Sequence, residues 1–285
     1  MKYLKTVSHL LQIVMTPLRS NWAFFTFIYL LGCICAWVTL PDARGAKLYD
    51  NLYPELFLDV YVLATILTIL PRRVKPWIRG FFYFVLYTAA VVDVYCFVKF
   101  QSTLTPTMLL LVGETDSREA GEFIRSCVSP DILMSGVGWV LLLMAVHILT
   151  AIKLRFPHFV PRNWCRLVRS ILVQSRFFLH RVRHVTEFAV LALLVFSIVM
   201  SAHNKTATLK LMTGKTIGDV EHTLTEKDHA VLYQPIYRLA FSIYANTLTA
   251  KQVDKLIATA DKVRVDSCSF TSPNIVLIIG ESYNR

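Results

Sequence analysis

The stretch from Trp22 to Leu40 reads WAFFTFIYLLGCICAWVTL and contains no charged side chain. A helix that crosses a bilayer needs about 20 mostly apolar residues, and Pro41 and Asp42 end this run. Apolar residues make up 55% of the 285-residue chain and charged residues only 17%. A soluble domain carries about a quarter charged residues, and disorder requires low hydrophobicity. We therefore expect an α-helical integral membrane protein.

Four more apolar runs follow the first one. They cover Leu56–Leu70, Phe81–Val98, Ile132–Ile152 and Val185–Ala202. Each run is rich in branched and aromatic residues, and each is followed by a polar or charged segment. We expect five transmembrane helices.

The Lys and Arg residues are distributed unevenly between the connecting segments. Segments 1–21, 71–80 and 153–184 hold 15 Lys and Arg and no acidic residue, whereas segments 41–55 and 99–131 hold 5. Cytoplasmic loops carry the excess of basic residues, so this bias predicts the N-terminus inside and the part after residue 203 outside. The net charge of +11 thus reflects topology, and no nucleic acid partner is expected.

In segment 153–184, basic residues recur at helical spacing. Arg162, Arg166 and Arg169 share one helical face, which favours contact with anionic membrane lipids over a partner-binding helix.

Two outer regions are longer than simple connectors. Within 99–131, an amphipathic helix is expected around Met108–Val112, followed by an acidic stretch. This loop is either structural or a lipid headgroup site, since carboxylates can hold an ammonium group. In the tail, residues 232–246 are expected to form an interfacial helix, and Thr249 to cap the next helix.

Asp59, Asp93 and His147 are ionisable residues inside the expected spans. Asp59 and Asp93 are near the outer ends, where they either form a functional site or bond to the interface or a neighbouring helix. His147 is expected to be a packing residue.

The chain ends with the sequence SPNIVLIIGESYNR, from Ser272 to Arg285. Five consecutive branched apolar residues, Ile275–Ile279, predict a buried parallel strand. Gly280 then turns the chain, and Glu281 follows. Active groups of α/β sheets lie at the carboxyl ends of strands, so Glu281 is placed where a metal could bind.

This ending resembles the opening strand of the catalytic domain in the sulfatase/alkaline phosphatase superfamily, and more narrowly the membrane-bound phosphoethanolamine transferases of Gram-negative bacteria. In the resemblance, Glu281 matches the family's first zinc-ligating carboxylate. Arg285 matches the Arg that follows this carboxylate shortly afterwards in the family. Upstream, the segment ETDSREA (114–120) resembles the family motif that binds the phosphatidylethanolamine headgroup, with Thr115 and Glu119 at the matching positions. Asp116 stands where Asn is common in the family, so an amide donor is lost there.

The resemblance implies an enzyme of the bacterial inner membrane whose C-terminal part is periplasmic. A zinc-activated Thr would take phosphoethanolamine from phosphatidylethanolamine and pass it to lipid A or the core of lipopolysaccharide. Zinc would be the cofactor, with Glu281 as a ligand rather than the base.

The domain organisation expected from the sequence has three parts. They are a transmembrane domain at 1–203, periplasmic connector helices at 204–271, and the start of a sulfatase-like domain at 272–285. The family's Thr nucleophile and later Asp-His pair cannot be placed in these 285 residues. We therefore expect this chain to lack the catalytic domain and to be inactive by itself.

The sequence is also compatible with other functions. A glycerophosphate transferase of the lipoteichoic acid synthase type shares the five spans, and a non-catalytic membrane anchor or regulatory module needs no catalytic domain. A small transporter should show internal repeats, and none is evident. The cysteines form no CxxC pair, and Cys127 and Cys268, both expected outside, either pair or stay separate.

Overall fold

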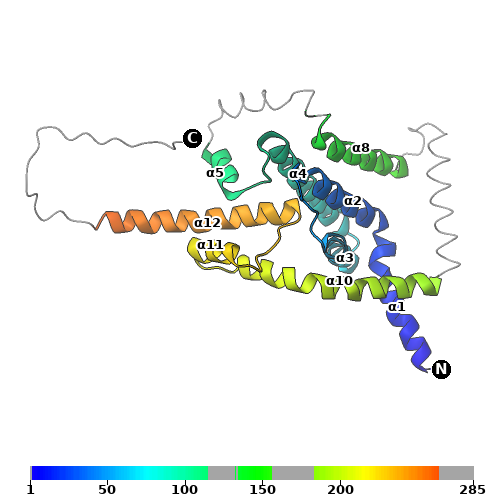
Figure 1. Ribbon diagram of the computed structural model, residues 1–285. Helices are drawn as coiled ribbons and strands as arrows, with labels where there is room; N and C mark the ends of the chain where they lie inside the picture. Colours follow the sequence, from blue (N-terminus) through cyan, green and yellow to red (C-terminus); the bar gives the residue numbers. More distant parts are fainter. Residues whose placement is uncertain (1, 115–131, 133, 156–182, 263–285) are drawn as a thin grey trace, which may run out of the picture.

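The computed structural model describes residues 2–114, 132, 134–155 and 183–262. Throughout these residues the regular structure is helical, without strands (Figure 1). The helices, in chain order, are α1 (Lys2–Ser20), α2 (Trp22–Val38), α3 (Leu52–Ile69), α4 (Lys75–Phe100), α5 (Pro106–Glu114), α8 (Gly136–Arg155), α10 (Arg183–Leu211), α11 (Ile217–Thr225) and α12 (Pro235–Ala260).

Several of these helices can cross a membrane. By length and composition α3, α4 and the Val185–Leu211 part of α10 qualify. A fourth span results if Leu11–Ser20 and Trp22–Val38, bent by 76°, are one broken span, whereas the apolar helix Gly136–Ile152 is shorter. The described chain is therefore a helical protein with three or four candidate spans. Each of the five expected runs contributes to a helix, but this does not establish five crossings.

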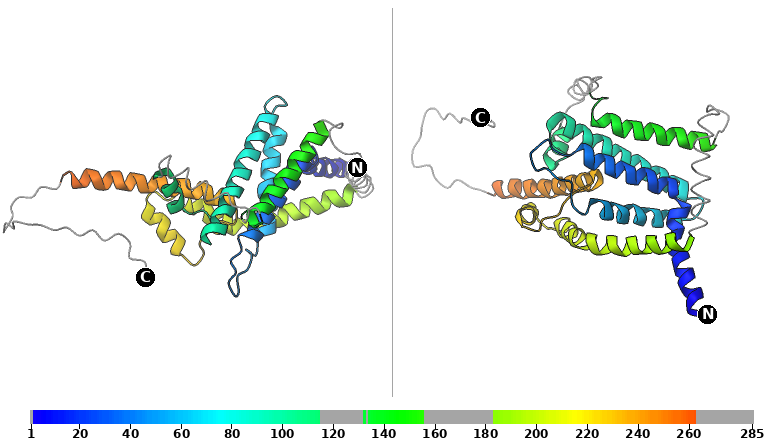
Figure 2. Two further views of the ribbon diagram at one scale, coloured as in Figure 1. Left: turned by 90° about the horizontal axis from the view of Figure 1, so that it is seen from above. Right: turned by 45° about the vertical axis from the view of Figure 1, so that its right-hand side comes forward.

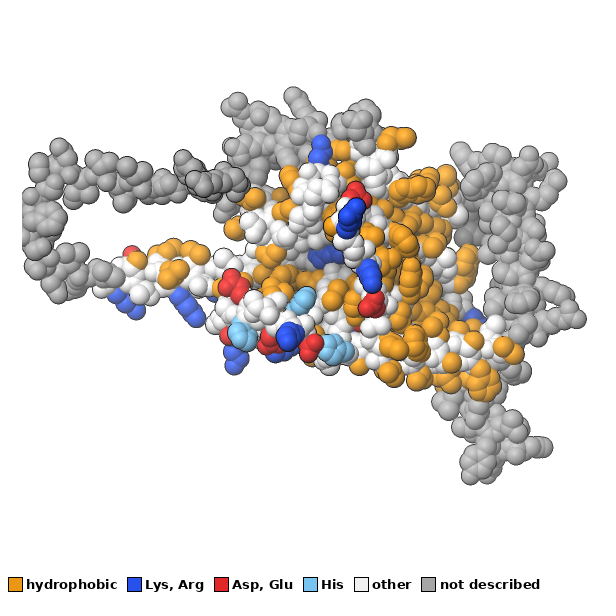
Figure 3. Space-filling view, viewed as in Figure 1, with side chains coloured by type: hydrophobic (Ala, Val, Ile, Leu, Met, Phe, Trp, Pro, Cys, Tyr) orange, Lys and Arg blue, Asp and Glu red, His pale blue; other side chains and the backbone are white. Residues whose placement is uncertain are grey.

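The surface of α10 supports a membrane environment. Its apolar side chains point outward over much of its length, and Val185, Phe188 and Val199 are 66%, 54% and 67% exposed. Figure 3 shows hydrophobic side chains over this side of the bundle, while charged side chains and histidines gather around α11. A helix of a soluble protein buries its apolar face, so these residues are placed to contact lipid.

Small residues let the spans approach one another closely. Ala64, Ala89 and Ala90 are buried, and Gly32 of α2 lies directly against the fully buried Leu56 of α3. Helix pairs in membranes pack through such small side chains, because lipid supplies no hydrophobic force between them. Phe24 fills the space beside them, with its ring 5.2 Å from that of Tyr83.

One end of the bundle, called here the α1 end, carries α1. Figure 2 shows α1 passing the end of α10 and projecting beyond it, and α1 packs against α3 and α10. Arg19 Nη2 lies 3.0 Å from Oε1 of the fully buried Glu187 on α10. Lys75 Nζ, at the start of α4, donates to Ser20 Oγ at 3.0 Å. The basic turn after α3 therefore lies at the same end as α1.

The opposite end, the α12 end, carries α5, α11 and α12. The expected boundary at Thr249 is wrong: α12 is continuous from Pro235 to Ala260, and Thr249 Oγ1 donates back to Ala245 O inside it. Between residues 236 and 260 there is no Pro or Gly to break the helix. The fifth expected span also continues, because α10 runs nine residues past Ala202 to Leu211.

The close approach of α2 and α3 makes Gly32 sensitive to any side chain. A Cβ at this position would lie 2.5 Å from Leu56 Cδ1, so Gly32→Val should destabilise the protein by about 1–3 kcal/mol. The change is measured by SDS-driven unfolding in mixed micelles. Gly80→Ala is the control, since nothing lies within 4 Å of its Cβ position. Equal stability of Gly32→Val and the wild type would contradict this packing.

Candidate functional site

The residues singled out by the family resemblance lie outside the described part of the chain. This applies to Thr115, Glu119, Glu281 and Arg285, and also to the possible Cys127–Cys268 pair. The described residues nevertheless reach the edge of the first motif, because α5 ends at Glu114. Among the described residues, polar side chains from several helices come together at the α12 end.

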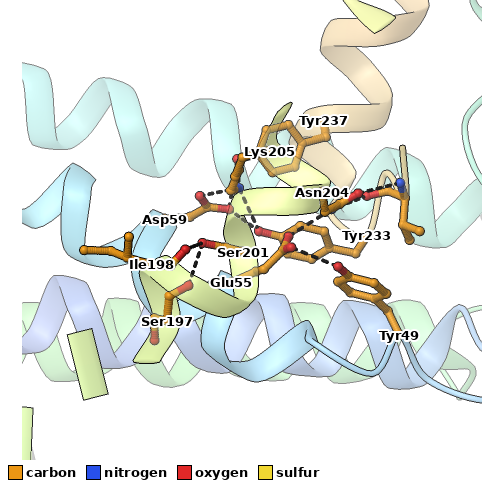
Figure 4. A network of polar contacts seen from close by, with 11 residues as sticks. Tyr49, Glu55, Asp59, Ser197, Ile198, Ser201, Asn204, Lys205, Tyr233 and Tyr237 are labelled. Carbon is orange, nitrogen blue, oxygen red and sulfur yellow. Dashed lines mark hydrogen bonds and ion pairs between the residues drawn. The ribbon is translucent and has the colours of Figure 1, made fainter. Parts of the chain in front are cut away.

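Asp59 of α3 is the centre of a closed circuit of polar contacts (Figure 4). Its Oδ1 lies 2.6 Å from Lys205 Nζ of α10. The same ammonium donates to the hydroxyls of Tyr233 and Tyr237, at 3.1 Å and 2.6 Å. Both hydroxyls donate in turn to Asp59 Oδ2, that of Tyr237 at 2.9 Å. All three N–H groups of the ammonium are thereby used.

The two tyrosines stabilise the ammonium in a second way. Lys205 Nζ lies 4.5 Å from the ring centroid of Tyr237 and 5.3 Å from that of Tyr233, within the range of a cation–π contact. Burial, and then the Asp59 carboxylate, raise the pKa of both phenols above the usual value. The hydroxyls therefore stay protonated and remain donors to Asp59.

Glu55, one helical turn before Asp59, is fully buried and bonded to neutral groups. Tyr49 donates to Oε1 and Asn204 Nδ2 to Oε2, each at 2.9 Å. The amide of Asn204 also donates to the Val231 carbonyl at 3.1 Å and accepts from its N–H at 2.8 Å. This double contact fixes the orientation of the amide. Burial, followed by the bond to Glu55, raises the pKa of Tyr49 to about 12.

Asp93 of α4 forms a second junction. Its Oδ2 lies 2.5 Å from Arg238 Nη1 of α12, and its Oδ1 accepts from the backbone N–H of Leu104 at 3.0 Å. Leu104 lies two residues before α5. Arg238 Nε also donates to Leu232 O at 2.8 Å. One fully buried carboxylate thus joins the start of α5 to α12.

The sequence pointed to two of these residues and missed their partners. For Asp59 and Asp93 the sequence is compatible with a functional site or with a bond to the interface or a neighbouring helix, and the structure gives both of them ionic partners. Glu55 was missed, although its spacing of four residues from Asp59 places both on one helical face. Lys205 and Arg238 belong to the expected connector, 204–271, and only the tertiary fold brings them to the spans.

His147 has the packing role that was predicted for it. Its ring stacks on Phe27 at 4.3 Å and meets the edge of Tyr83 at the same distance. Its Nδ1 lies 3.0 Å from the Tyr87 hydroxyl.

The contacts around Asp59 and Asp93 are suited to joining helices. Across the described ranges, no group of three or more His, Cys, Asp or Glu could hold a metal ion. Asp59 and Asp93 are occupied by the chain's own cations. Paired buried polar groups rigidify the elements that they join, here α3, α4, α10 and α12.

No protein-family model matches the chain, and no curated protein or solved structure shows a significant similarity to it.

Asn204 provides a test of the network with a single side chain. Asn204→Ala leaves Glu55 Oε2 and both backbone groups of Val231 without this partner, so the free energy of unfolding should fall by about 1–3 kcal/mol. Unfolding in mixed micelles measures the loss. Asn246→Ala on α12, where no such bonds exist, should change stability little. If the two variants behave alike, the assigned bonds at Asn204 contribute nothing.

Proposed function

We propose that this chain is the membrane and connector part of a phosphoethanolamine transferase. It has five spans in the bacterial inner membrane, with the N-terminus inside and the part after residue 203 in the periplasm. The complete enzyme takes phosphoethanolamine from phosphatidylethanolamine and transfers it to lipid A or to the lipopolysaccharide core.

The contact of Asp93 with both the segment that enters α5 and α12 is the observation that carries this proposal. One oxygen of Asp93 holds the entry to α5, which ends just before Thr115, and the other holds Arg238 of α12. The two helices also pack against each other. Helix α5, which precedes the headgroup motif in the sequence, is therefore held beside α12, which precedes Glu281. A transferase needs its donor-binding and catalytic groups close together.

The separation of charges along the bundle supports the proposed topology. Arg19 and Lys75 lie together at the α1 end, while the chain that follows α10 returns to the spans at the α12 end. The described basic residues Arg19 and Lys75 thus lie at the end that should face the cytoplasm. Helices α5 and α12, which precede the family motifs in the sequence, lie at the opposite end, which we assign to the periplasm.

Each proposed site residue has a defined role. The carboxylate of Glu119 would bind the ammonium of the donor headgroup, since opposite charges attract strongly near the membrane interface, and Thr115 would hydrogen-bond the same headgroup. Glu281 is the one zinc ligand that we propose, because the described residues contain no group of three or more His, Cys, Asp or Glu that could hold a metal.

The zinc assignment is tested with Glu281→Ala in the protein expressed from its complete gene. We expect loss of bound zinc and of transfer from labelled phosphatidylethanolamine to lipopolysaccharide, with unchanged membrane insertion, because a removed ligand opens the metal site. Zinc content and mass spectrometry of the acceptor measure these effects. Glu221→Ala, on the surface of α11, is the control.

Transfer and zinc content that survive Glu281→Ala would overturn the ligand assignment. Labelled glycerophosphate on the acceptor, with phosphatidylglycerol as the donor, would instead identify the glycerophosphate transferase. Absence of any transfer would leave the membrane anchor as the better description.

A further inference from the structure

Helix α12 is attached to the bundle over only part of its length. Its N-terminal half buries Phe241, Ala245 and Leu248 against α10 and α11. Residues 251–260 are all exposed, and Figure 1 shows this half extending beyond the other described helices. The attached half therefore decides the direction in which the free half points.

Two consecutive residues fix the attached half to different spans. Tyr237 joins the circuit around Asp59 of α3, and Arg238 pairs with Asp93 of α4. Neighbouring residues on a helix point about 100° apart, because a turn has 3.6 residues. Restraints in two directions limit both the rotation of α12 about its axis and its tilt.

Burial makes both restraints strong. Asp93 is fully buried, and Lys205 and Asp59 expose only 27% and 19% of their side chains. Breaking such a pair leaves a charge without its partner in a region of low dielectric. An exposed pair at the same end, Lys210–Glu226, offers a contrast, since solvent screens it.

The circuit is better suited to clamping than to binding a ligand. A carboxylate with two phenol rings is the chemistry that recognises an ammonium group, but Lys205 already supplies that ammonium and each of its N–H groups has a partner. The role of the circuit must therefore come from the segments that it joins.

We propose that Asp59, Lys205 and Arg238 are positioning residues that clamp α12 and thereby set where its free half, 251–260, stands relative to α5 and the spans. This inference rests on the proposed transferase function and deepens it. The three residues touch neither donor nor acceptor. They act through α12, and Arg238 also acts through the carboxylate that holds the entry to α5.

The clamp is tested by electron–electron distance measurements on the full chain in lipid nanodiscs. Spin-labelled amino acids replace the exposed Lys47, before α3, and Lys255, on the free half of α12. Genetic encoding of the label leaves the six native cysteines in place. We expect one narrow distance distribution, which broadens and shifts in Lys205→Met and in Arg238→Met. Lys210→Met, the matched control, should leave it unchanged.

Tyr237→Phe covers the case in which Lys205→Met fails to fold. It removes one hydroxyl from the circuit and keeps the ring, so it should give a smaller broadening. Distributions that stay the same in Tyr237→Phe, Arg238→Met and any folded Lys205→Met protein would overturn the clamp.

A kinetic measurement tests the positioning role separately. In the protein from the complete gene, Arg238→Met should lower kcat by about tenfold or more with unchanged zinc content, because small misplacements of reacting groups are costly. Unchanged kcat alongside a broadened distribution would overturn the positioning role. If the wild type shows no transfer, the proposed function fails, and the distance measurement still decides the clamp.

Discussion

The arrangement of this protein depends on pairing two carboxylates of its spans, the half-buried Asp59 and the fully buried Asp93. A charge at this depth is costly unless it is paired, and Asp59 and Asp93 each have a cation supplied from a distant part of the chain. Their partners, Lys205 and Arg238, come from the end of α10 and from α12. The need to pair these carboxylates therefore determines where the chain after the last candidate span returns to the bundle.

The two ends of the bundle are held together by different kinds of interaction. At the α1 end a single helix packs against α3 and α10 and basic residues gather, which suits the surface of an anionic leaflet. At the α12 end the tyrosines, Asn204 and the buried ion pairs connect helices that are far apart in sequence. The first end is suited to anchoring in the membrane. The second is suited to holding extramembrane segments in a defined place, as the proposed transfer requires.

The sequence predicted the apolar helices well, because a run such as Phe81–Val98 has few alternatives in a membrane. It did not predict the length of α12, since a Thr at position 249 suits both a cap and a helix interior that bonds back to Ala245. The partners of Asp59 and Asp93 were also beyond prediction. Local patterns place a carboxylate on a helical face, but a residue 146 positions away, such as Lys205, becomes its neighbour only through tertiary packing.

The central claim is that Asp59 and Lys205 form one energetic unit at the α12 end, and a double-mutant cycle tests it most directly. The free energies of unfolding of Asp59→Asn, Lys205→Met and the double variant are compared in mixed micelles, with Lys210→Met/Glu226→Gln as the exposed reference cycle. We predict a coupling of about 1–3 kcal/mol between Asp59 and Lys205, and a clearly smaller one in the reference. Additive losses for the buried pair would contradict the account, because each residue would then contribute independently of the other.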